Sequence, residues 1–412
     1  MASERVLIIA VKQPDMKESR FQSSLEELVS LTKTAGGTVE KIITQKRHQI
    51  DPALYMGSGK VNEIKQYIEE LEINLVISND ELSPGQLRNL SNLFEVRLID
   101  RSQLILDIFA RRAKTKEGQL QVELAQLEYL LPRLHGKGVE LSRLGGGIGT
   151  RGPGETKLET EQRHIRQKIH DIKRKLKVVV EQREQYRKRR RMNKVFQIAI
   201  VGYTNAGKST LFNRLTESDS LEEDRLFATL DPLSRKLRLP SGFTALVTDT
   251  VGFIQELPTT LIAAFRSTLE EVTEADFLLH VVDSSHEDVE QHQTTVLKLL
   301  KELGADKIPM LTVYNKKDLL DDSFIPMHHP NIIISALDDQ DLHSLVVKIE
   351  SVLKETWNQY IIELDPDEGK MLNRLIQETI IENKEFDAQT NKYKICGFMR
   401  HNHPLQKLIH EQ

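Results

Sequence analysis

The sequence predicts an α/β protein built from several domains. Strand-like and helix-like stretches alternate over the first hundred residues and again after residue 195, which is the order that produces sheets of largely parallel strands. Between these regions, hydrophobic residues recur at spacings of three and four, a pattern typical of helices that pack side by side. At 412 residues the chain is too long for one ordinary core, and these patterns favour four domains.

The first predicted domain is a small α/β domain over residues 1–100. Its expected strands and helices alternate in the order 6–11, 23–36, 38–45, 60–71, 73–78, 83–94 and 96–100, beginning with a strand. Within it, MGSGK at 56–60 resembles a phosphate loop, but Leu54 stands where that motif needs glycine and Val61 where it needs serine or threonine. We interpret MGSGK as a turn that opens a helix.

Residues 101–194 predict an antiparallel helical hairpin that projects from the first domain. Its two hydrophobic seams are Leu120, Leu124, Leu127, Leu131 and Leu134, then Leu158, Ile165, Ile169, Ile172, Leu176 and Val179. The second helix, expected from about Glu155 to Arg190, would be roughly 50 Å long at 1.5 Å per residue. The tip of the hairpin is then the connection at about 135–156.

Charge is distributed unevenly along the chain. Residues 151–195 carry 16 lysines and arginines against 6 aspartates and glutamates, whereas the whole chain has a net charge of −4. A basic block in an acidic chain indicates local contact with a polyanion. The alternative is an ordinary solvated helix face.

The predicted tip contains LGGGIGTRGPGE at 144–155, with six glycines in twelve positions. It has no Gly-Lys-Ser and no strand before it, so it is a poor nucleotide loop. Glycines allow close approach to a phosphate backbone and arginines supply charge, so we expect the tip to contact RNA. The expected contact residues are Arg143, Gly145, Gly146, Gly147, Gly149, Arg151 and Gly152. The alternative is a flexible linker.

Residues 195–357 contain a phosphate-loop motif in its proper context. The apolar strand 196–201 precedes GYTNAGKST at 202–210, and a helix at 211–217 follows it. The loop backbone can hold phosphates, Lys208 can offer its cation to the β and γ phosphates, and Ser209 can ligate Mg²⁺. The predicted loop residues that bind nucleotide are Gly202, Tyr203, Thr204, Asn205, Ala206, Gly207, Lys208, Ser209 and Thr210.

Further nucleotide-binding elements follow in the order that a GTPase needs. LVTDTVG at 246–252 supplies Asp249 near the metal, directly or through water, and the Gly252 amide near the γ-phosphate. Asp318 can accept hydrogen bonds from both donors on the Watson–Crick edge of guanine, which adenine does not offer. The predicted base-binding residues are Asn315, Lys316, Asp318, Ser335, Ala336 and Leu337. Four such elements in register between 202 and 337 predict a P-loop GTPase domain that binds GTP and Mg²⁺.

Phe253 departs from the usual chemistry. Many signalling GTPases have a water-orienting glutamine directly after the glycine that corresponds to Gly252. A phenyl ring cannot hydrogen-bond an attacking water, so we expect slow intrinsic hydrolysis until a partner or another residue positions that water.

Three stretches together closely resemble the HflX family of ribosome-associated GTPases. They are GGGIGTRGPGETKLETEQR at 145–163, MGSGKVNEI at 56–64 and FATLDPLSR at 227–235, although TEQR differs slightly from the usual ending of that motif. The resemblance implies that Thr229 reaches Mg²⁺ when GTP is bound and acts in catalysis with Lys208 and Gly252. It also implies a partner, the 50S subunit with its 23S rRNA, and an action on stalled or idle 70S ribosomes under stress.

Residues 358–412 predict a small C-terminal α/β domain. The single cysteine, Cys396, excludes an internal disulfide, and no apolar stretch approaches the length of a membrane span. We therefore expect a cytoplasmic monomer without a membrane anchor. Two other functions stay open: an RNA-binding protein that uses GTP only as a conformational ligand, and a signalling GTPase with a protein effector.

Overall fold

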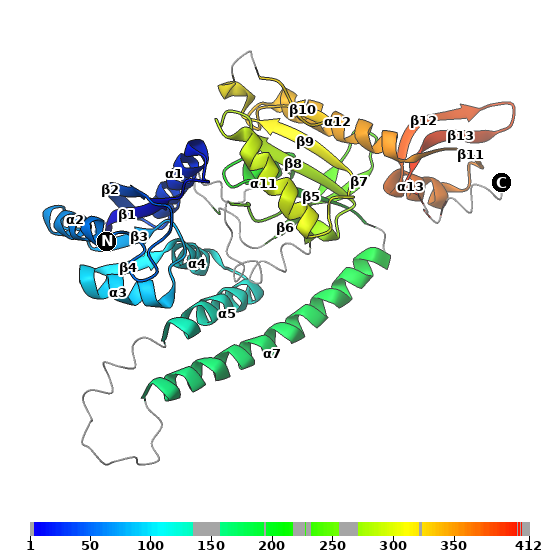
Figure 1. The fold of residues 1–412 in the computed structure, drawn as a ribbon. Coiled ribbons are helices and arrows are strands. Elements are labelled where there is room, and N and C mark those ends of the chain that lie inside the picture. Colours follow the sequence, from blue (N-terminus) through cyan, green and yellow to red (C-terminus); the bar gives the residue numbers. More distant parts are fainter. Residues whose placement is uncertain are drawn as a thin grey trace. The chain divides into compact units, whose positions relative to one another are not determined.

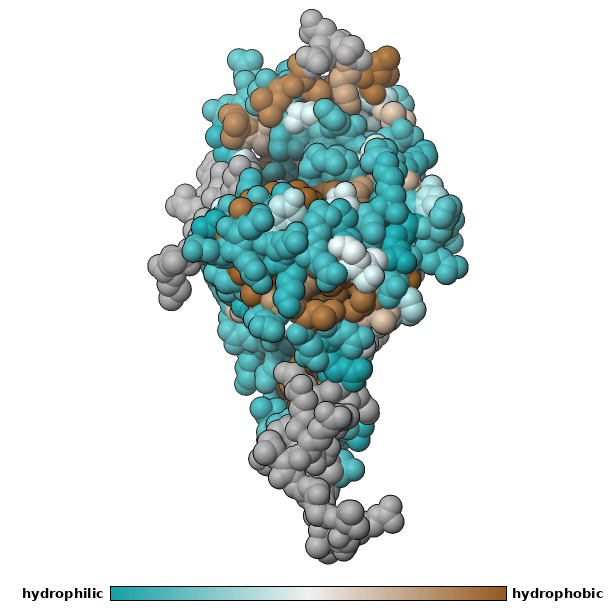
Figure 2. Space-filling model, turned by 60° about the vertical axis from the view of Figure 1, so that its left-hand side comes forward, coloured by the Kyte–Doolittle hydropathy of each residue, from teal (hydrophilic) through white to brown (hydrophobic). Residues whose placement is uncertain are grey.

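The computed structural model describes residues 4–134, 157–192, 195–216, 227, 232–254, 271–320, 324–401, 403 and 405. By contacts between residues the chain divides into two compact units, one mainly of Met1–Arg183 and the other mainly of the residues from Glu184 onward (Figure 1). The predicted four-domain division at residues 100, 194 and 357 stays a prediction. Across the described ranges no helix is long and apolar enough to cross a membrane, and hydrophilic side chains cover most of the face drawn in Figure 2.

The first unit contains a four-stranded parallel sheet in the order β2-β1-β3-β4. The elements are β1 (Glu4–Lys12), α1 (Glu18–Thr34), β2 (Gly37–Lys46), α2 (Ser58–Glu70), β3 (Leu75–Ser78), α3 (Pro84–Phe94) and β4 (Arg97–Asp100). The central strand β1 is buried on both faces from Val6 to Val11, as a strand between two helical layers requires. The predicted α/β fold of this domain is confirmed.

Local sequence signals set the helix starts in this sheet domain. Ser83 and Gln86 form a capping box at α3, in which each side chain accepts a hydrogen bond from the other residue's backbone N–H, and Pro84 occupies the first turn. Helix α2 begins at Ser58, directly after Gly57. MGSGK is therefore a turn that opens a helix, as predicted.

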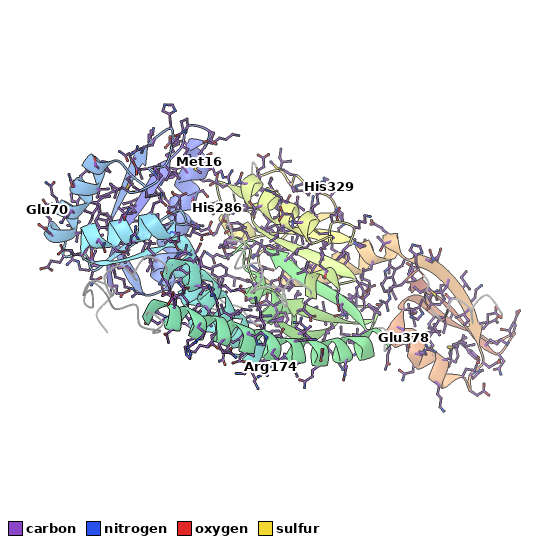
Figure 3. All side chains as sticks on the ribbon, turned by 60° about the horizontal axis from the view of Figure 1, so that its bottom comes forward. Met16, Glu70, Arg174, His286, His329 and Glu378 are labelled. Atoms are coloured by element: carbon purple, nitrogen blue, oxygen red, sulfur yellow. The ribbon has the colours of Figure 1, made fainter. Side chains whose placement is uncertain are left out.

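The next helices are α4 (Arg101–Arg112), α5 (Lys116–Arg133) and α7 (Lys157–Met192), and the first unit extends along α7 to Arg183. Two ion pairs join α5 to α7: Glu117 with Arg183 at 2.8 Å and Glu128 with Lys173 at 2.8 Å. The pair nearer the start of α5 involves the residue nearer the end of α7, so the two helices are antiparallel. The predicted hairpin is confirmed. With 36 residues, α7 is about 54 Å long, and Arg174, labelled on α7 in Figure 3, is exposed.

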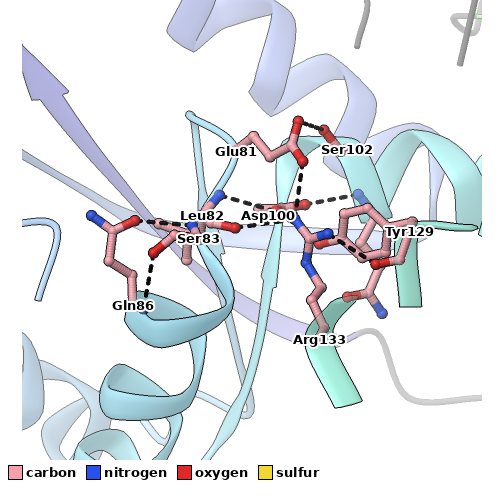
Figure 4. Close-up of polar contacts among 9 residues, drawn as sticks. Glu81, Leu82, Ser83, Gln86, Asp100, Ser102, Tyr129 and Arg133 are labelled. Atoms are coloured by element: carbon pink, nitrogen blue, oxygen red, sulfur yellow. Dashed lines mark hydrogen bonds and ion pairs between the residues drawn. The ribbon is translucent and has the colours of Figure 1, made fainter. Parts of the chain in front are cut away.

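Arg133, at the C-terminal end of α5, ties this helix to the sheet domain (Figure 4). Its guanidinium lies 3.0 Å from a Glu81 carboxylate oxygen and 3.4 Å from one of Asp100, and it donates to the Leu82 carbonyl at 3.0 Å. The same group stacks 3.4 Å above the centre of the Tyr129 ring. These contacts hold the C-terminal end of α5, the first helix of the hairpin, against the sheet domain.

The second unit contains a six-stranded sheet in the order β10-β9-β8-β5-β7-β6, in which only β6 is antiparallel to its neighbour. Its strands are β5 (Phe196–Gly202), β6 (Leu233–Arg238), β7 (Thr244–Asp249), β8 (Phe277–Asp283), β9 (Met310–Asn315) and β10 (Asn331–Ile333). Its helices are α8 (Lys208–Thr216), α11 (Val289–Glu302), the short η2 (Lys317–Leu319) and α12 (Asp339–Thr356). The predicted phosphate-loop fold is confirmed, whereas β6 is an edge strand that the sequence analysis does not anticipate.

One hydrophobic core joins this sheet to α8 and α12. It contains Phe277, Leu279 and Val281 from β8, Leu211 and Phe212 from α8, and Leu342, Leu345 and Ile349 from α12. These β8 residues alternate along the strand and so share one face of the sheet. Val296 and Leu300 of α11 are also buried but lie outside this core, so α11 covers the opposite face.

The chain ends in a three-stranded antiparallel sheet with one helix, which confirms the small C-terminal α/β domain. The elements are β11 (Asn358–Leu364), α13 (Gly369–Glu378), β12 (Ile380–Asp387) and β13 (Lys392–Met399), and the strand order is β11-β13-β12. Trp357 precedes β11 and lies edge-on against Phe196 and Phe243, at centroid distances of 5.4 and 5.3 Å. Ile380 of β12 belongs to the same core as β5 and β8.

Candidate nucleotide site

The phosphate loop lies between the end of β5 and the start of α8. Gly207 has a φ of 88°, and a Cβ atom there would lie 2.2 Å from the Asn315 side-chain nitrogen. A side chain at this position would therefore be strained and would collide with Asn315, a predicted base-binding residue. The glycine requirement of the motif has a local steric cause in this protein.

Lys208 is buried at the first turn of α8. Its ammonium donates to the Tyr203 carbonyl at 2.7 Å. Burial lowers the pKa of Lys208 to about 8, although the carboxylate of Asp249 acts in the opposite direction. Negative charge from a phosphate beside this ammonium would favour the protonated form.

Ser209 and Asp249, which come from separate elements, meet at this site. The Ser209 hydroxyl donates to a carboxylate oxygen of Asp249 at 2.9 Å, and Asp249 is 1 % exposed at the end of β7. A hydroxyl and a carboxylate are oxygen donors of the kind that Mg²⁺ prefers. The chemistry of this pair therefore fits the predicted metal.

The segment after β7 pairs with the phosphate loop. The Phe253 N–H donates to the Gly202 carbonyl at 3.1 Å, and the Phe253 carbonyl accepts from the Thr204 N–H at 2.8 Å. A Cβ atom at Gly252 would lie 2.8 Å from the Thr204 side chain and 2.9 Å from the Lys208 ammonium. Gly252 is thus held against the loop that it is predicted to assist, and the Phe253 ring is 3 % exposed.

The predicted base-binding residues lie together at the carboxyl ends of β9 and β10. Asn315 donates to the Ala206 carbonyl at 2.9 Å and accepts from the Ala336 N–H at 2.9 Å, so it links the phosphate loop to both base-binding segments. The Ser335 hydroxyl donates to a carboxylate oxygen of Asp318 at 2.6 Å. Leu337 is 66 % exposed beside these residues.

Asp283, which the sequence analysis omits, contacts a predicted base-binding residue. Its carboxylate pairs with the Lys316 ammonium at 2.5 Å. Asp283 ends β8, which pairs with β9 at Asn315. Because the carboxyl ends of parallel strands form the usual ligand crevice, its position after an apolar strand was a usable signal.

Several predicted residues lie outside the described residues. Thr229 is one of them, and the predicted RNA contacts are the others: Arg143, Gly145, Gly146, Gly147, Gly149, Arg151 and Gly152. Their roles stay predictions. The described site therefore covers the phosphate loop, Asp249, Gly252 and the base-binding segments.

Three family models match consecutive stretches of the chain. A family described as GTP-binding GTPase N-terminal matches residues 22–110, and one described as GTP-binding GTPase Middle Region matches residues 112–190. A third, described as 50S ribosome-binding GTPase, matches residues 197–316. Together these matches cover most of the sheet domain, most of the hairpin and most of the second sheet.

Individual relatives match over most of their own length. The chain is 55 % identical over 410 residues to a GTPase HflX of Alkalihalophilus pseudofirmus, which is 99 % of this chain and 97 % of the relative. It is 42 % identical over 374 residues to GTPase HflX of Escherichia coli K12, which is 89 % of this chain and 88 % of the relative. A solved structure described as SsGBP with GDP is 24 % identical, covers 85 % of this chain and 98 % of its own and has a TM-score of 0.50, so it supports the fold alone.

The six-stranded sheet and the phosphate loop with its base-binding segments define a P-loop GTPase. With 55 % identity over almost its whole length to one GTPase HflX, the chain belongs to the HflX family of GTPases.

Proposed function

We propose that this GTPase uses Mg²⁺ with GTP, associates with the 50S ribosomal subunit, and dissociates or rescues stalled or idle 70S ribosomes under stress. The ribosome would stimulate hydrolysis. The observation that carries the ribosomal assignment is the match of residues 197–316 to a family described as 50S ribosome-binding GTPases. A cytoplasmic monomer is part of the same proposal.

Each group of the nucleotide site has its own proposed role in binding the phosphates or Mg²⁺. The N–H groups of the phosphate loop and of the α8 N-terminus would hold the phosphates, and the Lys208 ammonium would neutralise charge that develops on the β and γ groups. Ser209 and Asp249 would hold Mg²⁺ directly or through water, and Thr229 would join them when GTP is bound. When bound, Mg²⁺ supplies further positive charge to the phosphates.

The position of Phe253 supports slow hydrolysis by the protein alone. Its ring is buried, and its N–H and carbonyl both bond to the phosphate loop. The ring has no hydrogen-bonding group and the N–H is already used, so neither can orient an attacking water. A partner that supplies or positions a polar group would therefore raise the rate, as proposed for the ribosome.

The charge of α7 supports contact with ribosomal RNA. Among the α7 side chains that the structure describes, seven lysines and arginines are exposed: Arg163, Arg166, Lys168, Lys173, Arg174, Lys175 and Lys177. The apolar seam at Ile165, Ile169, Ile172, Leu176 and Val179 is half-buried or buried, so the cations lie on the remaining surface. Such a surface favours contact with a polyanion such as RNA. We propose that the glycines and arginines of the tip extend this contact toward 23S rRNA.

The test compares GTP turnover by the purified full-length protein alone, with 50S subunits and with 30S subunits. We expect 50S subunits to raise the rate by at least about tenfold, which corresponds to roughly 1.4 kcal/mol off the barrier. The 30S subunits control for RNA in general, and Lys208→Ala controls for contaminating GTPases. A rate that 50S subunits leave unchanged would contradict ribosomal stimulation and favour GTP as a conformational ligand only.

A further inference from the structure

Asp341 contacts two segments of the base-binding region although it belongs to neither. It lies in the first turn of α12. Its carboxylate accepts from the Ser335 N–H at 2.8 Å and pairs with the Lys317 ammonium at 2.9 Å. Burial alone would raise the pKa of Asp341, but these two donors lower it below its usual value, so the carboxylate is charged at neutral pH.

Helix capping does not account for this arrangement. The N-cap of α12 is Asp338, whose side chain accepts from the N–H groups of Gln340 and Asp341. The Asp341 carboxylate is directed to the loops instead. Lys317 is largely exposed, so solvent screens its ion pair with Asp341, and the bond to the Ser335 backbone is the informative contact.

Ser335 connects Asp341 to the residue proposed to read the base. Its N–H is held by Asp341, and its hydroxyl donates to the Asp318 carboxylate at 2.6 Å. Lys317, the second partner of Asp341, directly precedes Asp318 in η2. Asp341 therefore restrains Asp318 in two ways. It holds Ser335, which bonds to the Asp318 carboxylate, and it holds Lys317, which precedes Asp318 in the chain.

Recognition of guanine requires a defined orientation of the Asp318 carboxylate. To accept from both the ring N–H and the 2-amino group, both Asp318 oxygens must lie in the plane of the base. Asp318 is itself exposed, so its side chain needs support to keep that orientation. Each carboxylate oxygen has two acceptor positions, so the bond from Ser335 leaves room for the base.

We propose that Asp341 is a positioning residue for guanine recognition, acting through Ser335 and Lys317 to fix the orientation of Asp318. The inference rests on the proposed role of Asp318 as the reader of the base. Asp341 does not touch the nucleotide; its effect is on selectivity.

The test measures dissociation constants of GDP and of inosine diphosphate, which lacks the 2-amino group, by competition against a fluorescent GDP analogue on full-length protein. We expect the preference for GDP to fall by at least about fivefold in Asp341→Ala. Asp341→Asn should lose less, because its amide oxygen can still accept from the Ser335 N–H. Asp339→Asn is the matched control: Asp339 precedes it by two residues, is 92 % exposed, pairs with Arg214 and should leave the preference unchanged.

Asp318→Asn, measured in parallel, separates two failures. If it lowers the GDP preference while Asp341→Ala does not, Asp318 reads the base and the positioning role of Asp341 is wrong. Equal weakening of both ligands by Asp341→Ala would show general support of the loop, which also overturns the proposal. If Asp318→Asn leaves the preference unchanged, the base assignment itself fails.

Discussion

The ammonium group of Lys208 lies in a buried environment that disfavours its charged form. Its ammonium is buried and has the Tyr203 carbonyl as a hydrogen-bond partner, and burial brings its pKa to about 8. A phosphate beside it favours the charged form, so its pKa is higher in the nucleotide complex than in the free protein. Nucleotide binding above pH 8 is therefore coupled to uptake of a proton.

This coupling predicts a pH dependence of GDP affinity. The affinity is fully developed below about pH 7 and falls as the pH rises through about 8. The fall between about pH 7 and about pH 9 is about tenfold when Lys208 is the only titrating group. Fluorescence titration with a GDP analogue across this range measures it. Lys208→Met removes the titrating group while leaving the base contacts, so its remaining slope reports the titration of the nucleotide. An equal slope in parent and variant would show that Lys208 does not titrate in this range.

At the residue scale, the sequence predicted those parts of the site that depend on a contiguous motif. Residues 202–210 run from the last residue of β5 through the loop 203–207 into the first turn of α8, because the motif and its flanks are local. The sequence did not predict the contacts of Asp341 with Ser335 and Lys317. These contacts form only because the fold brings the ends of β9 and β10 to the first turn of α12. Nothing in the spacing of DDQD at 338–341 distinguishes this carboxylate from its neighbours.

At the element scale, α5 is more deeply involved in packing than its leucine spacing indicates. The seam at Leu120, Leu124, Leu127 and Leu131 is only half-buried, whereas Gly118, Val122, Ala125 and Tyr129 are buried. Helix α5 also lies against α4. Heptad spacing identified the hairpin but not this second face, because small and mixed residues give a weak periodic signal.

The contacts of Arg133 should stabilise α5 against local opening. Arg133→Met removes the partner of the Glu81 and Asp100 carboxylates, and Asp100 is fully buried. Leaving a buried carboxylate with fewer donors costs about 1–3 kcal/mol. We expect hydrogen-exchange protection of the α5 amides to fall by about tenfold or more, since local opening of this helix becomes easier.

Arg97→Met is the matched control for that variant. Arg97 also contacts two carboxylates, Glu4 at 3.3 Å and Asp107 at 3.6 Å, but its side chain is 53 % exposed. Exposed pairs contribute about 0–1 kcal/mol, so protection of α5 should hardly change. Equal loss of protection in the two variants, or none in Arg133→Met, would show that Arg133 does not anchor the hairpin.

At the scale of the whole molecule, nucleotide chemistry and the proposed RNA contact use different parts of the chain. The described nucleotide site draws on residues 202–209, 249–253, 315–318 and 335–336. The exposed cations of α7 lie between residues 163 and 177. A change confined to the RNA-facing part should therefore leave nucleotide affinity intact while removing the action on ribosomes.

Replacement of residues 145–152 by a short serine-rich connection tests this separation most directly. Parent and variant are compared in GTP binding by fluorescence titration and in 70S dissociation by sucrose gradient. We predict unchanged GTP affinity and loss of 70S dissociation, with weak, salt-sensitive ribosome binding retained through the cations of α7. Full dissociation activity in the variant would make the glycine-rich stretch a linker only, and lost GTP affinity in a folded variant would mean that the glycines serve the nucleotide; either result contradicts the proposed division of labour.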